Sequence, residues 1–266
     1  MAGKNKKPIY DSVKFSDSED EFKYETSDSE TELDLYLEKL NLGPKKKLLV
    51  MNLNGLLLHR VHLSKKSEIP ESREADGRYR SYLVFKRPFS EEFMKFCLER
   101  FEVGIWSSAM EHNIDDALNY AIGASRKRML FIWDQDQCTN SGFKCKGNAR
   151  KPIFFKELRK VFEDVKKGGP FSASNTLLID DNPYKAFLNP VCTWIFPESY
   201  DPHNDADRAL DPKGELCLFL SRVAEEADVQ SYLKDHPFGQ APITSGHPDW
   251  EFYSTVKQSL CQKRGY

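Results

Sequence analysis

Residues 48–58 have the sequence LLVMNLNGLLL, in which a short apolar run leads to two asparagines. A continuous Leu/Val run of this length is typical of a strand buried on both faces in a parallel sheet. Residues two apart on a strand point to the same face, so Asn52 and Asn54 are expected to project together where the strand ends. Because open α/β sheets bind ligands outside the carboxyl ends of their strands, this pair marks a candidate site.

Strand-like and helix-like segments alternate along the middle of the chain. Strands are predicted at 81–85, 101–106, 129–133, 176–181 and 193–195, and helices after a cap at Ser90 and at 111–120, 154–165 and 216–223. Residues 64–80 are polar and predict a loop, and residues 134–150 predict a hairpin or loop. This alternation is typical of βαβ units, and it predicts an α/β fold with a mostly parallel sheet.

Length, charge and cysteine usage exclude several classes of protein. The 266 residues, 39% of them hydrophobic, are enough for one large domain with tails, and the net charge of −2 gives no general attraction to nucleic acid or membrane. No run approaches the roughly 18 apolar residues of a transmembrane helix, and the N-terminus resembles neither a signal nor a transit peptide. Six cysteines without a C-x-x-C pair indicate reduced thiols in the cytosol or nucleus.

The two ends of the chain differ from its middle. Residues 1–44 contain the acidic stretches SDSEDE and SDSE, which have too few apolar groups to form a core, and a short helix is predicted only at 32–42. Residues 236–266 are rich in turns and close with an amphipathic segment, which we expect to pack on the domain as a C-terminal extension. The folded domain is therefore predicted to span 45–235.

Polar residues follow three predicted strands, and a lysine begins the helix before the third. These residues are Asn52, Asn54, Ser107, Lys156, Asp180 and Asp181. An ammonium group and a hydroxyl suit the oxygens of a phosphate, whereas paired carboxylates with amide or carbonyl oxygens suit Mg²⁺. Each of these residues taken alone is a weak signal, because polar residues at strand ends are common in ordinary turns. Only the ordered set indicates a site.

In combination these segments resemble a known family. NLNGLL at 52–57, KRP at 86–88, IWSSA at 105–109, KEL at 156–158 and IDDNP at 179–183 are similar to the FCP homology domain of the FCP-type and small CTD phosphatases. That domain belongs to the haloacid-dehalogenase (HAD) superfamily, and the resemblance covers about residues 45–235. It implies a HAD-like, Rossmann-like three-layer α/β fold with a central mostly parallel sheet and a small hairpin insertion.

The resemblance also implies a mechanism and a place for each residue. In the family, one aspartate attacks phosphoserine or phosphothreonine, a second aspartate two residues on acts as acid and base, and Mg²⁺ is bound beside them. By position, Asn52 stands at the nucleophile and Asn54 at the acid/base, while Ser107 and Lys156 are the implied phosphate-binding residues. The implied metal ligands are Asn52, the backbone carbonyl of Asn54, Asp180 and Asp181.

The chain departs from the family where the chemistry is done. A neutral amide is a poor substitute for a carboxylate nucleophile, and Asn54 has no titratable proton for acid catalysis. Mg²⁺ binding is expected to be weakened, since the charge of the first strand is lost while Asp181 and the Asn54 carbonyl remain.

The sequence therefore predicts a catalytically impaired homologue of protein serine/threonine phosphatases. We expect a monomer in the nucleus or cytoplasm that binds a phosphorylated protein or peptide segment or another partner, without direct nucleic-acid binding or membrane insertion. Two alternatives stay open. One is an active Mg²⁺-dependent CTD-type phosphatase; the other is a component like the mitochondrial inner-membrane translocase receptor that uses the same domain, which the absence of a transmembrane helix and transit peptide disfavours.

Overall fold

The first strand is buried on both faces, as its apolar sequence requires. In β1 (Lys47–Met51) the side chains of Leu49 and Met51 enter one hydrophobic cluster, and those of Leu48 and Val50 enter another on the opposite face. All four are fully buried. Burial of a side chain of this size contributes roughly 1.5–3 kcal/mol, so β1 is a major source of the core's stability.

The structure is a computed structural model, and it describes residues 45–264. Its other strands are β2 (Leu58–His62), β3 (Gly77–Tyr79), β4 (Tyr82–Lys86), β5 (Phe101–Trp106), β6 (Phe131–Trp133), β7 (Thr139–Cys145), β8 (Asn148–Phe155), β9 (Thr176–Ile179) and β10 (Trp194–Ile195). The α-helices are α2 (Ser90–Arg100), α3 (Asp115–Ile122), α4 (Leu158–Asp164), α5 (Glu215–Glu225), α6 (Val229–Asp235) and α7 (Trp250–Arg264). Short 3-10 helices are η1 (Lys66–Glu68), η2 (Glu111–Asn113), η3 (Gly123–Arg128), η4 (Gln135–Gln137) and η5 (Pro183–Ala186). The acidic tail and the helix predicted at 32–42 lie outside the described residues.

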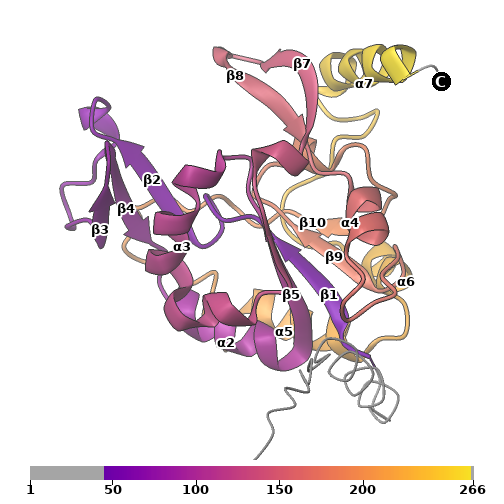
Figure 1. The fold of residues 1–266 in the computed structure, drawn as a ribbon, viewed down its shortest axis with the longest axis horizontal. Coiled ribbons are helices and arrows are strands. Elements are labelled where there is room, and N and C mark those ends of the chain that lie inside the picture. The colour runs from indigo at the N-terminus through magenta and orange to yellow at the C-terminus, as the bar shows by residue number, and fades with distance from the viewer. Residues whose placement is uncertain (1–44, 265–266) are drawn as a thin grey trace, which may run out of the picture. The chain divides into compact units, whose positions relative to one another are not determined.

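A five-stranded parallel sheet lies at the centre, in the order β10-β9-β1-β5-β6 (Figure 1). The chain runs outward from β1 through β5 to β6 and then returns to the other side of β1 for β9 and β10. The strand order therefore reverses at β1. In open α/β sheets such a reversal opens a crevice at the carboxyl ends of the strands, where ligands bind.

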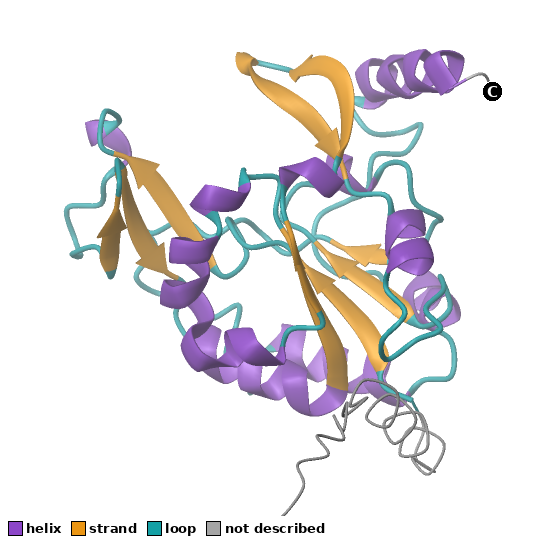
Figure 2. Ribbon diagram, viewed as in Figure 1, coloured by secondary structure: helices purple, strands orange, loops and turns teal. Residues whose placement is uncertain are grey.

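Helices cover both faces of this sheet, and smaller sheets extend from it (Figure 2). Side chains of α2, α3, α5 and α6 share the cluster that includes Leu49, whereas Leu158 and Val161 of α4 share the cluster that includes Leu48. The predicted three-layer α/β fold with a mostly parallel sheet is thus confirmed. An antiparallel sheet of order β2-β4-β3 is inserted in the chain between β1 and α2, and the hairpin β7-β8 is inserted between β6 and α4.

The C-terminal residues pack against the hairpin. Tyr253, Val256 and Leu260 of α7 form a hydrophobic cluster with residues of β8 and η5, and the rings of Tyr253 and Tyr184 stack with centroids 5.3 Å apart. Within the described residues, no helix has both the length and the hydropathy needed to cross a membrane.

Several predicted boundaries differ from the structure for local reasons. The first strand ends at Met51, because the chain turns at Gly55 before β2 begins at Leu58. The predicted loop at 64–80 contains β3, which pairs with β4. Ser90 does not cap α2: Phe89 takes the capping position with φ of 63°, and the Ser90 hydroxyl donates to the carbonyl of Ala121.

The placement of Lys156 also differs from its prediction at the start of a helix. Strand β8 continues through Phe155 and α4 begins only at Leu158, so Lys156 lies in the connection between them. That connection lies beside η5, since the Lys156 amide donates to the carbonyl of Lys185, 2.8 Å away.

Candidate functional site

The carboxyl ends of β1 and β9 bring two of the predicted motifs together. The parallel pairing continues one residue past β1, because the amide of Asn52 donates to the carbonyl of Ile179 at 2.9 Å. The next residues of the β9 segment are Asp180 and Asp181. Asn52 and both aspartates are buried, so any interaction among them takes place away from bulk water.

The Asn52 carboxamide makes three hydrogen bonds at the centre of this cluster. Its Oδ1 accepts from Lys156 Nζ at 3.0 Å. Its Nδ2 donates to the backbone oxygen of Asn54 at 2.6 Å and to Oδ1 of Asp181, also at 2.6 Å. Lys156 Nζ further donates to Asp180 at 2.5 Å. Of the six residues predicted at the strand ends, five therefore form one connected network: Asn52, Asn54 through its backbone, Lys156, Asp180 and Asp181.

Asp180 is paired with two lysines rather than one. Its Oδ2 faces Lys156, and its Oδ1 lies 3.3 Å from Nζ of Lys185, a buried residue of η5. Burial alone would raise the pKa of Asp180, but the two ammonium groups and the amide of Asn182 hold that pKa below its ordinary value. The carboxylate is therefore ionised and fully engaged.

The two lysines respond differently to this burial. Desolvation lowers the pKa of Lys156, because the attraction of Asp180 does not fully offset the loss of water and the repulsion of Lys185. Desolvation also opposes the charge of Lys185, but Asp180 and Asp181 outweigh it and raise the pKa of Lys185. The cluster thus brings together two lysines and two aspartates, whose formal charges balance.

Arg60 on β2 fixes the orientation of Asn54. The Asn54 side-chain oxygen accepts from the Arg60 backbone amide at 3.1 Å and from its Nε at 3.2 Å. The same guanidinium donates to the hydroxyl of Tyr79 and to the carbonyl of Asn113. Because both hydrogen-bond partners of the Asn54 side-chain oxygen are donors, the Asn54 amide nitrogen points away from Arg60. It is a neutral N–H donor on a half-buried side chain.

Gly55 allows the turn after β1 to approach Asp181. Its φ is +90°, and a Cβ at this position would lie 2.1 Å from Oδ2 of Asp181. Only glycine avoids both the backbone strain and this overlap.

Ser107 follows β5, the neighbour of β1 on the side opposite β9. Its amide donates to the carbonyl of Trp133, and its Oγ accepts from the amide of Ala109 at 3.2 Å. Its carbonyl also accepts from the thiol of Cys138 at 3.9 Å. None of these described hydrogen bonds involves Asn52 or its partners, so the structure places Ser107 at the predicted edge without joining it to the network around Asn52.

The predicted Mg²⁺ ligands do not fit a cation in this arrangement. Each of the predicted oxygen ligands accepts a hydrogen bond from the protein. Asn52 Oδ1 accepts from Lys156, and the Asn54 carbonyl and Asp181 Oδ1 accept from Asn52. Asp181 Oδ2 accepts from the Asn182 side chain, Asp180 Oδ2 from Lys156, and Asp180 Oδ1 from the Asn182 amide, with Lys185 as a further ion-pair partner. Among residues 45–264, no group of three or more His, Cys, Asp or Glu side chains is arranged to hold a metal ion. The oxygens are present, but each faces a hydrogen-bond donor whose positive end would repel a cation bound beside it.

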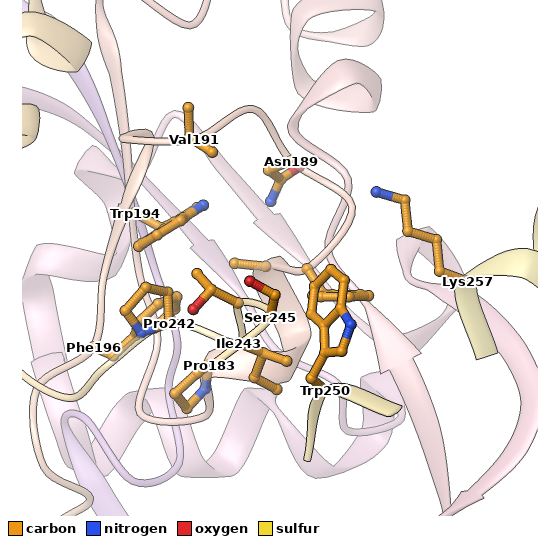
Figure 3. A pocket seen from close by; sticks show the side chains of 13 residues that line it. Pro183, Asn189, Val191, Trp194, Phe196, Pro242, Ile243, Ser245, Trp250 and Lys257 are labelled. Carbon is orange, nitrogen blue, oxygen red and sulfur yellow. The ribbon is translucent and has the colours of Figure 1, made fainter. Parts of the chain in front are cut away.

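A separate cavity of about 480 Å³ lies between the β10–η5 region and the C-terminal residues (Figure 3). Trp194, Phe196, Ile243 and Trp250 line it, and Lys257 stands at its edge. Its walls are mainly apolar, which does not suit phosphoryl chemistry. The strand-end network therefore remains the candidate site.

Sequence reasoning missed two residues that shape this site. Lys185 follows the IDDNP motif closely, so its lysine could have been noticed from spacing alone. Arg60 carries no such signal, because its contact with Asn54 depends on how β2 folds back after Gly55.

Known proteins similar to this chain carry the same domain. The NLI interacting factor-like phosphatase family matches residues 47–230. An uncharacterised FCP1 homology domain-containing protein of Schizosaccharomyces pombe is 29% identical over 208 residues, which cover 73% of this chain and 78% of that protein.

Solved structures of the RNA polymerase II CTD phosphatase Fcp1 are also similar to this chain. One is 14% identical with a TM-score of 0.39 and covers 86% of this chain and 65% of that structure, so the chain spans less than two thirds of it. The fission yeast enzyme bound to beryllium fluoride is also 14% identical, with a TM-score of 0.38 and coverage of 88% and 70%. The family match extends over more than half of the sequence and confirms the resemblance to the FCP-type phosphatases: this chain belongs to the NLI interacting factor-like phosphatase family.

Proposed function

We propose that this chain is an FCP homology domain protein with impaired phosphatase chemistry, which binds a phosphorylated protein segment or another protein partner without efficient hydrolysis. One observation carries the proposal. Asn52 stands at the family's nucleophile position, and its amide is engaged on both sides by Lys156, Asp181 and the Asn54 carbonyl.

Neither asparagine supplies what phosphoryl transfer needs. A covalent nucleophile needs an anionic or otherwise activated oxygen, whereas the Asn52 oxygen belongs to a neutral, delocalised amide and accepts from Lys156. An acid/base residue must give up a proton near neutral pH, which the amide of Asn54 cannot do. Losing one such group costs orders of magnitude in rate, and losses within a cooperating set are not additive.

The same substitutions favour retention of a phosphate group. Two neutral amides replace two carboxylates that would repel a phosphate monoester. The half-buried Asn54 offers an N–H donor, and Ser107 at the neighbouring strand end offers a hydroxyl hydrogen. Phosphoserine- or phosphothreonine-containing protein segments are therefore the ligand class we propose, with residues 45–235 as the binding domain and 236–266 as its extension.

The test of impaired chemistry is hydrolysis of an aryl phosphate with Mg²⁺. We expect the unmodified chain to release no phosphate above background, at least about a hundredfold less than Asn52→Asp/Asn54→Asp if that double variant recovers turnover. The single variants Asn52→Asp and Asn54→Asp show which group limits the rate. Turnover by the unmodified chain at rates typical of enzymes would favour the active-phosphatase alternative.

The test of ligand binding compares one peptide with and without phosphate on its serine. We expect fluorescence anisotropy to show tighter binding of the phosphorylated form to the full chain. Equal affinity for both forms would shift the proposal to a phosphate-independent partner. Imaging a fluorescent fusion tests the expected nuclear or cytoplasmic location against the mitochondrial alternative.

A further inference from the structure

We infer that the Asn52 carboxamide takes the place of a divalent cation at the end of β1, so that the folded chain neither binds nor needs Mg²⁺ there. This inference goes beyond the proposed function. It concerns what holds the strand-end network together, and it stands or falls independently of whether the chain hydrolyses or binds a phosphate ester.

The two donors of the Asn52 amide nitrogen connect two segments of the chain. An amide nitrogen has two hydrogens directed to different sides, and the Asn52 nitrogen places one on the Asn54 carbonyl and one on Asp181, each at 2.6 Å. The two acceptors come from the turn after β1 and from the end of β9. The amide therefore connects oxygen atoms of two segments. A bound cation connects segments in the same way in an oxygen-lined site.

Lys156 fixes the orientation of the Asn52 amide. Lys156 Nζ has only donors, and it lies 3.0 Å from the Asn52 oxygen. Turning the amide over would set its NH₂ group against the ammonium and its oxygen against the Asn54 carbonyl and the Asp181 carboxylate. All three contacts would become repulsive, so the observed orientation is the one that the surroundings allow.

The charges of the buried network also disfavour a bound cation. Lys156 and Lys185 balance Asp180 and Asp181 within the buried network, with both Asp180 oxygens facing lysines. A divalent cation would enter this balanced cluster as an excess of positive charge, and it would have to displace both Asn52 hydrogen bonds. Neither cost is offset by a new carboxylate ligand.

The experiment follows thermal unfolding of the full chain in EDTA and in excess Mg²⁺, for the unmodified chain and two matched variants. Asn52→Asp removes both donors and puts a carboxylate beside Asp181, so its Tm in EDTA is expected to fall. Mg²⁺ is then expected to raise it by roughly 5 °C or more when present at about a hundred times its Kd. Asn54→Asp adds the same charge beside Arg60, away from the Asn52 nitrogen, and serves as the control.

The inference holds if Mg²⁺ leaves the Tm of the unmodified chain and of Asn54→Asp unchanged while raising that of Asn52→Asp. It is overturned if Mg²⁺ stabilises the unmodified chain as much as it stabilises Asn52→Asp, or if Asn52→Asp shows no response.

A second measurement uses only the unmodified chain, so it does not depend on whether a variant folds. In NMR spectra of the full chain, the side-chain NH₂ signals of Asn52 are expected to exchange slowly with water, because both hydrogens are bonded to buried acceptors. Added Mn²⁺, a paramagnetic substitute for Mg²⁺, should leave these signals unbroadened. Rapid exchange, or selective broadening of these signals by Mn²⁺ at protein-equivalent concentration, would overturn the inference.

Discussion

At the scale of single residues, Gly55 is the position where the turn after β1 leaves no room for a side chain. Its φ of +90° is strained for any other residue, and a Cβ would overlap the Asp181 carboxylate. That carboxylate also accepts from Asn52 and Asn182, so it cannot move without breaking hydrogen bonds. The close approach of Gly55 to Asp181 thus shows that the turn after β1 is packed directly against the hydrogen-bonded network.

Substituting Gly55→Ala is therefore expected to destabilise the fold by about 2–4 kcal/mol, from backbone strain together with displaced hydrogen bonds. Gly147→Ala is the matched control, because Gly147 has a φ of +78° but open space around a new Cβ. It should cost only the strain, about 1–2 kcal/mol. Urea unfolding measures both. Equal losses in the two variants would mean that Asp181 does not press against Gly55 in solution.

At the scale of elements, one buried carboxylate joins the hairpin, α4 and α7. Glu157 precedes α4 and accepts from both terminal nitrogens of Arg264 on α7, at 3.0 and 2.6 Å, and from the hydroxyl of Thr139 on β7. Burial by itself would raise the pKa of Glu157, but these partners outweigh it and hold the pKa below the ordinary 4.5. Since Glu157 follows Lys156, this junction also supports the connection that carries the lysine.

The Glu157→Gln substitution is expected to cost about 1–3 kcal/mol at pH 7, because it weakens charge-assisted hydrogen bonds. A carboxyl with a lowered folded-state pKa stabilises the fold above its unfolded pKa and loses that effect as the pH falls through the folded value. The difference between the unmodified chain and Glu157→Gln should therefore be full above pH about 4.5 and shrink below it. Denaturant unfolding across pH 3–7 measures this difference.

Glu163→Gln, on the helix that follows Glu157, is the control. Glu163 is exposed and lies 3.4 Å from Arg159, an arrangement that contributes little. If Glu163→Gln lost as much stability as Glu157→Gln, the role given to the buried carboxylate would be contradicted. The same holds if the stability difference between the unmodified chain and Glu157→Gln did not depend on pH.

At the scale of the whole molecule, the sequence predicts the framework better than the contacts. The parallel sheet and the strand ends at Asn52 and Asp180 could be predicted, because apolar runs followed by polar residues are local patterns. The bonds of the Asn52 amide could not, since they depend on Lys156, which is 104 positions away in the sequence. The role of Arg60 likewise depends on the pairing of β2 after a turn.

At the scale of the whole molecule, Asn52 leaves the end of β1 without a nucleophile, and intact mass spectrometry tests this absence most directly. The full chain is mixed with an aryl phosphate and Mg²⁺, quenched in acid and weighed. We predict no phosphoryl adduct on the unmodified chain at any time of mixing, together with no release of phosphate. A phosphoryl adduct on the unmodified chain, or steady phosphate release from it, would contradict the account.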